Sequence, residues 1–324
     1  MYTFATKWEK VESSGNSEIN NLYIHKPVLL EEVCGWLSCR PGGRYLDCTI
    51  GTGGHAWRIL DHSRPDGTLI GIDRDASALA LARERLKEFG ERARLLHGHF
   101  SELAYHLQSV GVSEVDGVLF DLGVSSTQLG APSRGFSFST DGPLDMRMDQ
   151  RSGQTAAEVV NQLAESELAD LVYRYGEERY ARRIARALVR ARERGPLRTT
   201  SELVAVIRDA VPASYRHGRL HCATRTFQAL RIAVNRELDS LADSLREATR
   251  VLAAGGRLCV ISFHSLEDRI AKQTLRALSH GPGACLAALT KKPVRPSDDE
   301  LRTNPRARSA RLRVAERLPE GRLP

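Results

Sequence analysis

The sequence has no long apolar run, no C-x-x-C pair and no phosphate-loop lysine, and each absence excludes a class of protein. A membrane-spanning helix needs about 18 or more apolar residues in a row, so we expect no membrane segment. The six cysteines show no repeated spacing, which argues against a disulfide framework and favours reduced thiols in the cytoplasm. Residues 1–22 lack a basic segment followed by an apolar one, so we predict a flexible tail.

Positive charge is concentrated in two segments. Lys and Arg number 47 against 40 Asp and Glu, a net charge of +7. Residues 179–220 alone carry eleven arginines against three acidic residues, and residues 291–324 carry ten basic against five acidic residues. These segments together exceed the total net charge, so the rest of the chain is net acidic. The distribution predicts a basic face for a polyanion such as RNA, with a merely solvated arginine-rich surface as the alternative.

Short apolar runs that alternate with helix-forming stretches predict an α/β fold. The runs cover residues 44–46, 68–72, 93–96 and 115–120, and a later run covers residues 257–263. Successive strand-helix units of this kind form a mostly parallel sheet with helices on both faces. We therefore predict a Rossmann-like, doubly wound domain.

The alternation stops after Gly123. Residues 123–149 are rich in Ser, Gly, Pro and Asp, which is typical of a long functional loop. Helical stretches follow, and one long helical pattern extends over residues 223–252. We predict an all-helical insert at 140–218 that interrupts an α/β domain formed by residues 23–139 and 219–324.

A glycine-rich turn, residues 51–54, follows the first predicted strand and its terminal Asp47. Glycines there let a ligand approach the backbone closely. The spacing fits neither a phosphate loop nor the dinucleotide G-x-G-x-x-G motif, which disfavours nucleoside triphosphates and NAD. Asp73, at the end of the second strand, is placed to accept hydrogen bonds from ribose hydroxyls. A ligand that contains adenosine without a phosphate, namely S-adenosylmethionine, fits these features, with Phe100 against the adenine.

Asp121 ends the fourth strand and is expected beside the transferred methyl group. Asp121 and the loop after it, through Ser125, are placed to accept the hydrogens of an exocyclic amine and so localise its lone pair for attack. Phe136 or Phe138 is a candidate stacking surface for an extruded base, and the alternative is that both anchor the loop in a core. His264, after the later strand, is a candidate for positioning the acceptor, whereas the competing interpretation is a helix start capped by Ser265.

Two other chemistries are disfavoured by the residues. Methylation at C5 of a pyrimidine usually needs a cysteine nucleophile, and Cys222 lies far along the chain from the strand ends. His217, His221 and Cys222 do not have the spacing of a metal site, so no metal is expected.

Eight segments, in order, resemble the RsmH (MraW) family of S-adenosylmethionine-dependent methyltransferases, which methylate N4 of a cytidine in the decoding region of bacterial 16S ribosomal RNA. The similarity extends over about residues 25–317. The matching segments are HKPVLLEE (25–32), DCTIGTGGH (47–55), DLGVSS (121–126), RGFS (134–137), PLDMRM (143–148), TRTFQALRI (224–232), SFHSLEDR (262–269) and NPRARSA (304–310).

The resemblance implies a methyltransferase domain with a helical substrate-recognition insert that acts on 16S ribosomal RNA. We expect that RNA to be part of the small ribosomal subunit and the protein to be a monomer or homodimer. It places cofactor contacts on Gly53, Gly54, His55, Asp73, Phe100, Asp121 and Gln128. Thr127 and Cys222 each replace a proline of the family pattern, and the first change is expected to alter the loop beside Gln128. The alternatives are a ribosome-assembly factor that binds the cofactor for structure alone, and an amino-methyltransferase for another nucleic acid.

Overall fold

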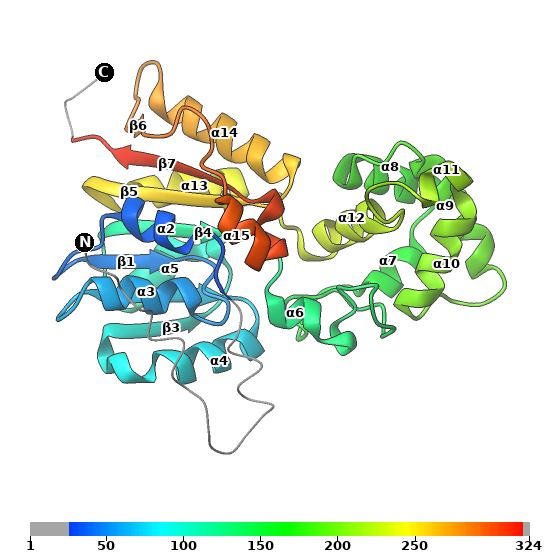
Figure 1. Ribbon diagram of the computed structural model, residues 1–324, viewed down its shortest axis with the longest axis horizontal. Coiled ribbons are helices and arrows are strands. Elements are labelled where there is room, and N and C mark those ends of the chain that lie inside the picture. Colours follow the sequence, from blue (N-terminus) through cyan, green and yellow to red (C-terminus); the bar gives the residue numbers. More distant parts are fainter. Residues whose placement is uncertain (1–25, 320–324) are drawn as a thin grey trace.

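The computed structural model describes residues 26–319, so the predicted tail at 1–22 and the motif residue His25 lie outside the described residues. The chain forms two lobes, one built on a sheet and one built from helices (Figure 1). No helix among the described residues has the length and apolarity needed to cross a membrane.

One seven-stranded mixed sheet forms the first lobe, in the order β3-β2-β1-β4-β5-β7-β6. Strands β3, β2, β1, β4 and β5 run parallel, and β7 pairs antiparallel with both β5 and β6. This confirms the predicted Rossmann-like α/β fold. The strands are β1 (Arg44–Asp47), β2 (Thr68–Asp73), β3 (Ala93–His97), β4 (Val115–Asp121), β5 (Leu252–Ser262), β6 (Leu286–Ala288) and β7 (Arg311–Arg317).

Helices cover both faces of the sheet, because β1, β2 and β4 are apolar on both sides. One core lies under α2 (Leu30–Leu37), α3 (Gly54–His62) and α4 (Ala76–Leu86). The other lies under α5 (Leu103–Ser109), α13 (Leu241–Arg250) and α14 (Ser265–Ser279). The remaining elements of this lobe are α15 (Asp298–Thr303) and the 3₁₀ turns η2 (Lys87–Arg92), η3 (Phe100–Glu102) and η5 (Pro305–Ser309).

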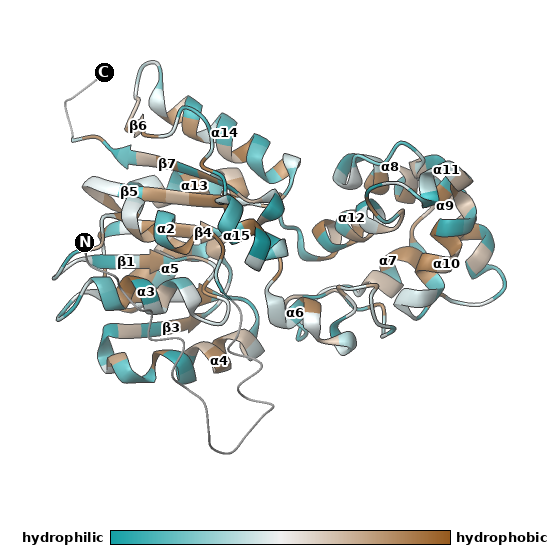
Figure 2. Ribbon diagram, viewed as in Figure 1, coloured by the Kyte–Doolittle hydropathy of each residue, from teal (hydrophilic) through white to brown (hydrophobic). Residues whose placement is uncertain are grey.

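The helical lobe has a separate apolar core that extends from Phe136 to Leu230. Figure 2 shows that helices of this lobe carry both hydrophobic and hydrophilic residues. Helix α9 illustrates the pattern, because Ile184, Ala185 and Leu188 are buried while four of its five arginines are exposed. The elements are α6 (Ser126–Gly130), η4 (Pro132–Arg134), α7 (Ala156–Gln162), α8 (Glu165–Gly176), α9 (Ala181–Arg192), α10 (Thr200–Ala210), α11 (Ala213–Arg216) and α12 (Thr224–Asn235).

Three expectations differ from the structure. The helical lobe includes α12, so its core continues beyond the insert boundary at residue 218. The long helix expected over 223–252 is broken, because Arg236 takes a left-handed backbone conformation and Asn235 is held by the backbone of Met146 and Met148. The loop expected at 123–149 contains α6 and η4.

Candidate cofactor and acceptor site

A pocket opens at the carboxyl ends of the parallel strands, where loops from both lobes meet. Seven of the predicted residues line it: Gly54, His55, Asp73, Phe100, Asp121, Ser125 and Gln128. Gly53, Phe136 and His264 are not lining residues, although Gly53 lies in the chain between Thr52 and Gly54, which are. The structure therefore brings most of the predicted site residues to one place.

The glycine loop needs its glycines for two different reasons. Gly53 is the N-cap of α3 with a φ of 80°, a conformation that other residues rarely adopt. A Cβ at Gly54 would lie 2.4 Å from Cγ of Pro27, which packs against the loop. Substitution at either position would therefore move the backbone that forms the pocket floor.

Asp73 is held by two backbone amides. Its Oδ2 accepts a hydrogen bond from Gly51 N at 2.8 Å, and its Oδ1 accepts one from Asp75 N at 2.8 Å. Burial raises the pKa of Asp73 to about 6, and these two hydrogen bonds limit the rise. The carboxylate is therefore fixed in orientation, as a group that receives ribose hydroxyls requires.

Asp121 has two unlike carboxyl oxygens. Oδ2 lies 3.4 Å from Nδ1 of His55, whereas Oδ1 is shielded from water and has no hydrogen-bond partner among the described residues. The side chain as a whole is 26% exposed, and its backbone amide donates to Oγ1 of Thr49 at 2.6 Å. Burial and the nearby carboxylates of Asp47 and Glu267 raise the pKa of Asp121 well above its usual range.

His55 is oriented by a carbonyl group. Its Nε2 lies 2.9 Å from the backbone oxygen of Val28, and a carbonyl can only accept, so Nε2 carries a hydrogen. This leaves Nδ1 turned toward Asp121. His55 is only 5% exposed, so it acts on the pocket mainly through that carboxyl group.

The site gathers acidic groups that repel one another. Asp47, at the end of β1, is 1% exposed, and burial together with Asp73 raises its pKa to about 7. A bound cation would relieve this repulsion and favour the ionised carboxylates. The residues therefore fit S-adenosylmethionine, whose sulfonium carries a positive charge.

Aromatic rings form one wall of the pocket. Phe100 lies with its ring centroid 4.0 Å from that of His99 and makes an edge contact with Phe120 at 5.6 Å. Such a wall suits the flat, apolar face of an adenine.

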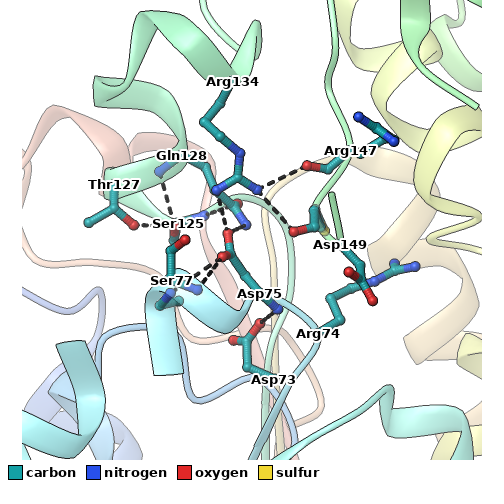
Figure 3. Close-up of polar contacts among 12 residues, drawn as sticks. Asp73, Arg74, Asp75, Ser77, Ser125, Thr127, Gln128, Arg134, Arg147 and Asp149 are labelled. Carbon is teal, nitrogen blue, oxygen red and sulfur yellow. Dashed lines mark hydrogen bonds and ion pairs between the residues drawn. The ribbon is translucent and has the colours of Figure 1, made fainter. Parts of the chain in front are cut away.

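Gln128 connects the pocket to a buried polar network (Figure 3). Its Nε2 donates to Oδ2 of Asp75 at 2.9 Å, and its Oε1 accepts from Ser125 N at 2.9 Å in the cap of α6. Arg134 donates to the same Asp75 oxygen at 2.8 Å and to the carbonyls of Arg147 and Met148. The two polar side-chain atoms of Gln128 thus hold the α6 loop against α4.

The departure at Thr127 is accommodated within this network. Its Oγ1 lies 2.8 Å from Oγ of Ser125, the N-cap residue of α6. The capping box of Ser125 and Gln128 fixes the loop without the proline of the family pattern.

Phe136 does not form a stacking surface in the pocket. It is 7% exposed and belongs to the core of the helical lobe, with the guanidinium of Arg134 5.8 Å from its ring. The loop-anchoring alternative therefore describes Phe136, because the Arg134 contacts draw this loop into the core. Phe138 is only partly buried and stacks on His221. Cys222 is buried in the same core, away from the pocket lining.

His264, rather than Ser265, is the N-cap of α14. Its Nδ1 accepts from Glu267 N at 3.4 Å, and its Nε2 lies 3.0 Å from Oε1 of Glu267. Although burial opposes ionisation of Glu267, His264 and Arg231 outweigh it and lower the pKa. His264 therefore affects the pocket through Glu267, which lines it.

Glu237, His264 and Glu267 also place ligand atoms within 4.8 Å of one another, as a metal site would. Arg231 already pairs with both oxygens of Glu237 at 2.9 Å and lies 3.8 Å from Glu267. The guanidinium of Arg231 thus supplies positive charge beside both carboxylates.

Sequence reasoning did not identify Asp75, Arg134, Arg231 or Glu267. Their roles depend on contacts between distant segments, such as Asp75 with Arg134, which no local spacing indicates. The exception is Glu267, whose position three residues after His264 is the spacing of a capping box.

Comparison with known proteins identifies the family. Residues 22–318 match the MraW methylase family. The chain is 52% identical over 310 residues to a Ribosomal RNA small subunit methyltransferase H of Pelobacter propionicus, covering 91% of this chain and 99% of that protein. It is also 52% identical over 309 residues to the protein of that name from Geobacter sulfurreducens, with the same two coverages. The chain therefore belongs to the MraW methylase family, whose methyl donor is S-adenosylmethionine.

Proposed function

We propose that this protein transfers a methyl group from S-adenosylmethionine to the N4 exocyclic amine of a cytidine in small-subunit ribosomal RNA, in the decoding region. The observation that carries the proposal is the Asp121 carboxyl group, which sits at the end of β4 in the same pocket as Asp73 and Phe100. Relatives that cover nearly the whole chain are named small-subunit ribosomal RNA methyltransferases, which supports the class of acceptor.

The cofactor-binding roles follow from the geometry of the pocket. Asp73 accepts hydrogen bonds from the ribose hydroxyls, and Phe100 packs against the adenine. The loop at Gly53, Gly54 and His55 passes beneath the amino-acid part of the cofactor. Gln128 acts by holding the α6 loop rather than by contacting the cofactor, because its Oε1 binds Ser125 N and its Nε2 binds Asp75.

Asp121 has the chemistry that an amine acceptor needs. The lone pair of an exocyclic amine is delocalised into the ring, so an oxygen that accepts an N–H localises it for attack on the electrophilic methyl group supplied by the cofactor. A carboxyl group with a raised pKa is also suited to take the proton that the amine loses. His55 orients the carboxyl group of Asp121, because its Nδ1 faces Oδ2 of that group.

Ser125 and His264 are positioning residues in this proposal. Ser125 caps α6 and so fixes the backbone that follows Asp121. His264 holds Glu267, whose charge helps to set the pKa of Asp121. Both side chains are engaged within the protein and shape the acceptor side of the pocket.

The α9 stripe, which consists of Arg182, Arg186, Arg190 and Arg194, is the proposed contact for RNA phosphates. All four are exposed and spaced four residues apart. Arg182, Arg186 and Arg190 share one face of α9, and Arg194 follows two residues after the helix ends. Only Arg186 has an ion-pair partner among the described residues, Glu165 at 3.4 Å. Arg192, by contrast, binds the carbonyls of Val160 and Leu163 and so is structural.

A methyl-transfer assay with purified small ribosomal subunits from a strain that lacks the modification tests this proposal. The wild-type protein should move label from S-adenosylmethionine into the 16S RNA, and Asp73→Asn and Asp121→Asn should not. Circular dichroism checks that both variants are folded. Undiminished transfer by both variants would overturn the assigned site, and absence of transfer by the wild type despite cofactor binding would favour an assembly factor.

A further inference from the structure

A rigid, exposed imidazole lies on the helical lobe outside the pocket. The ring of His221 stacks on that of Phe138, with centroids 4.6 Å apart and planes inclined by 22°. Phe138 in turn makes an edge contact with Phe227 of α12 at 5.1 Å. Because Phe227 is buried in the core, this stack rests on a fixed support.

A hydrogen bond also fixes the rotation of the imidazole. Nδ1 of His221 accepts the backbone N–H of Ala223 at 3.2 Å, so in the neutral ring the hydrogen is on Nε2. His221 is exposed even though one of its faces rests on Phe138. Since one face rests on Phe138 and the residue is nevertheless exposed, the solvent-accessible surface lies on the rest of the ring, where a ligand can reach it.

The surroundings of this ring are basic. Arg216 and Arg219 are exposed in the segment that leads to His221. The guanidinium of Arg208 lies close enough to Cys222, the residue after His221, to counteract the rise in its pKa that burial causes. Aromatic rings with an open face among cations are typical of surfaces that bind single-stranded nucleic acid.

The geometry points to the His221–Phe138 stack as a second base-binding site, which receives an unpaired nucleobase of the acceptor RNA a few nucleotides from the methylated one. This inference rests on the proposed function. Helix α12 begins at Thr224, just after His221, and ends at Asn235, beside pocket residue Glu237. Its 12 residues span about 18 Å, so one RNA strand can reach both sites.

The chemistry favours a base over a phosphate as the group that contacts the ring. An open π face offers dispersion and stacking to any base, and the hydrogen on Nε2 can reach an acceptor at its edge. The arginines beside it provide the phosphate contacts. The site should therefore tolerate different bases and should discriminate poorly between sequences.

Substitution at His221 tests the inference, with His217 as the matched control because it is an exposed histidine of the same segment with no stacked partner among the described residues. His221→Ala should raise KM for the RNA substrate about tenfold, while kcat and the Kd for S-adenosylmethionine stay unchanged. His221→Trp should restore KM, and His217→Ala should leave it unaltered. The slope of log Kd against log salt should not change, since no phosphate contact is lost.

Fluorescence gives a direct readout. A single-stranded RNA that carries 2-aminopurine at positions flanking the target should be quenched at one position by the wild type and by His221→Trp, but not by His221→Ala or Phe138→Leu.

Equal KM values for His221→Ala and His217→Ala, or failure of His221→Trp to restore binding, would overturn the inference. So would an effect seen with whole subunits but not with naked RNA, which would indicate a protein partner. If the wild-type protein did not methylate the RNA at all, that result would instead contradict the proposed function.

Discussion

At the scale of single residues, the pocket holds carboxyl groups whose pKa values are raised by burial and by one another. Asp47 has a pKa of about 7, Asp73 has one of about 6, and that of Asp121 lies well above its usual range. Each of these groups ionises more readily when a cation is near. Binding of a positively charged cofactor and ionisation of the site are therefore coupled.

Cofactor affinity should depend on pH. Asp73 must be ionised to accept two hydroxyl hydrogens, so the Kd for S-adenosylmethionine should rise about tenfold per unit as the pH falls below about 6. Calorimetric titration between pH 5 and pH 8 measures this. S-adenosylhomocysteine has the same ribose and no sulfonium. Its Kd should therefore change with pH as Asp73 ionises, but it should change less than that of S-adenosylmethionine as Asp47 and Asp121 ionise. Affinity independent of pH would contradict the role of Asp73.

Asp47 should make the protein less stable as the pH rises. Its pKa is higher in the folded state than the ordinary value of 3.8, so its contribution to stability is present below about pH 4 and is lost as the pH passes through about 7. Asp47→Asn should remove this dependence and raise the free energy of unfolding at pH 8. Urea unfolding at pH 5 and pH 8 compares the two proteins. If the free energy of unfolding of Asp47→Asn fell more steeply with pH than that of the wild type, Asp47 would stabilise the protein at high pH, which contradicts this prediction.

Asp121→Ala should lower kcat by about 10²- to 10⁴-fold, because the variant loses the oxygen that accepts the amine hydrogen. RNA affinity, measured by filter binding, should be nearly unchanged, since the α9 stripe is intact. The conservative control is Asp121→Glu, which keeps the carboxyl group but displaces it. A variant that turns over like the wild type would exclude Asp121 from the reaction.

The carboxylates were predictable from sequence, and two aromatic residues were less so. Asp47, Asp73 and Asp121 each end a parallel strand, and such ends meet at one edge of the sheet. Nothing in the local pattern distinguishes a loop Phe that is buried from one that is exposed. Of the two candidates, Phe136 is buried in the core of the helical lobe, and only Phe138 stacks on an exposed ring, that of His221.

At the scale of elements, a buried ion pair joins the two lobes. Arg134 and Asp75 are 8% and 3% exposed, and the pair links the N-terminus of α4 to η4 of the helical lobe. Arg74 adds a hydrogen bond to the carbonyl of Asn235, at the end of α12. The loop after β2 is thus held to the helical lobe by polar contacts at Arg74 and Asp75.

Breaking this pair should destabilise the protein strongly. Arg134→Gln should lower the free energy of unfolding by about 3–5 kcal/mol, because it leaves the Asp75 carboxylate buried without its cation. The double variant Arg134→Gln with Asp75→Asn should recover part of that loss. Denaturant unfolding of all four proteins gives the coupling free energy, and additive effects would show that the two side chains do not interact.

Strands and helix starts were easier to predict than helix breaks. The apolar runs located β1, β2, β3 and β4 to within a residue, since burial on both faces dictates their composition. The break between α12 and α13 depends on Asn235 binding backbone groups nearly ninety residues away. A helical pattern in the sequence carries no sign of such a contact, so one long helix was expected there.

At the scale of the whole molecule, residues 179–220 of the helical lobe carry eleven arginines, whereas Asp73, Asp121, Glu237 and Glu267 line the pocket together with Arg74, Arg85 and Arg306. Phosphates should therefore bind to the outer helices, and the pocket should admit a neutral base and a cationic cofactor. Figure 1 shows the helical lobe projecting from the sheet, which gives an RNA strand a second surface to follow.

Charge reversal of the α9 stripe should weaken RNA binding. Arg182→Glu, Arg190→Glu and Arg194→Glu together should lower the slope of log Kd against log salt by about 2. Reversal of Arg83 and Arg276, exposed arginines on the helices of the sheet lobe, is the matched control and should have little effect. Filter binding across a salt series measures both. An unchanged slope in the triple variant would show that the stripe is only a solvated surface.

The most direct test of the central claim identifies the methylated nucleoside. Small subunits from a strain that lacks the modification are incubated with S-adenosylmethionine and the wild-type protein or Asp121→Ala, and the digested 16S RNA is analysed by liquid chromatography and mass spectrometry. N4-methylcytidine should appear with the wild type alone. A methyl group found instead at C5 or on the ribose, or N4-methylcytidine formed equally by Asp121→Ala, would contradict the account.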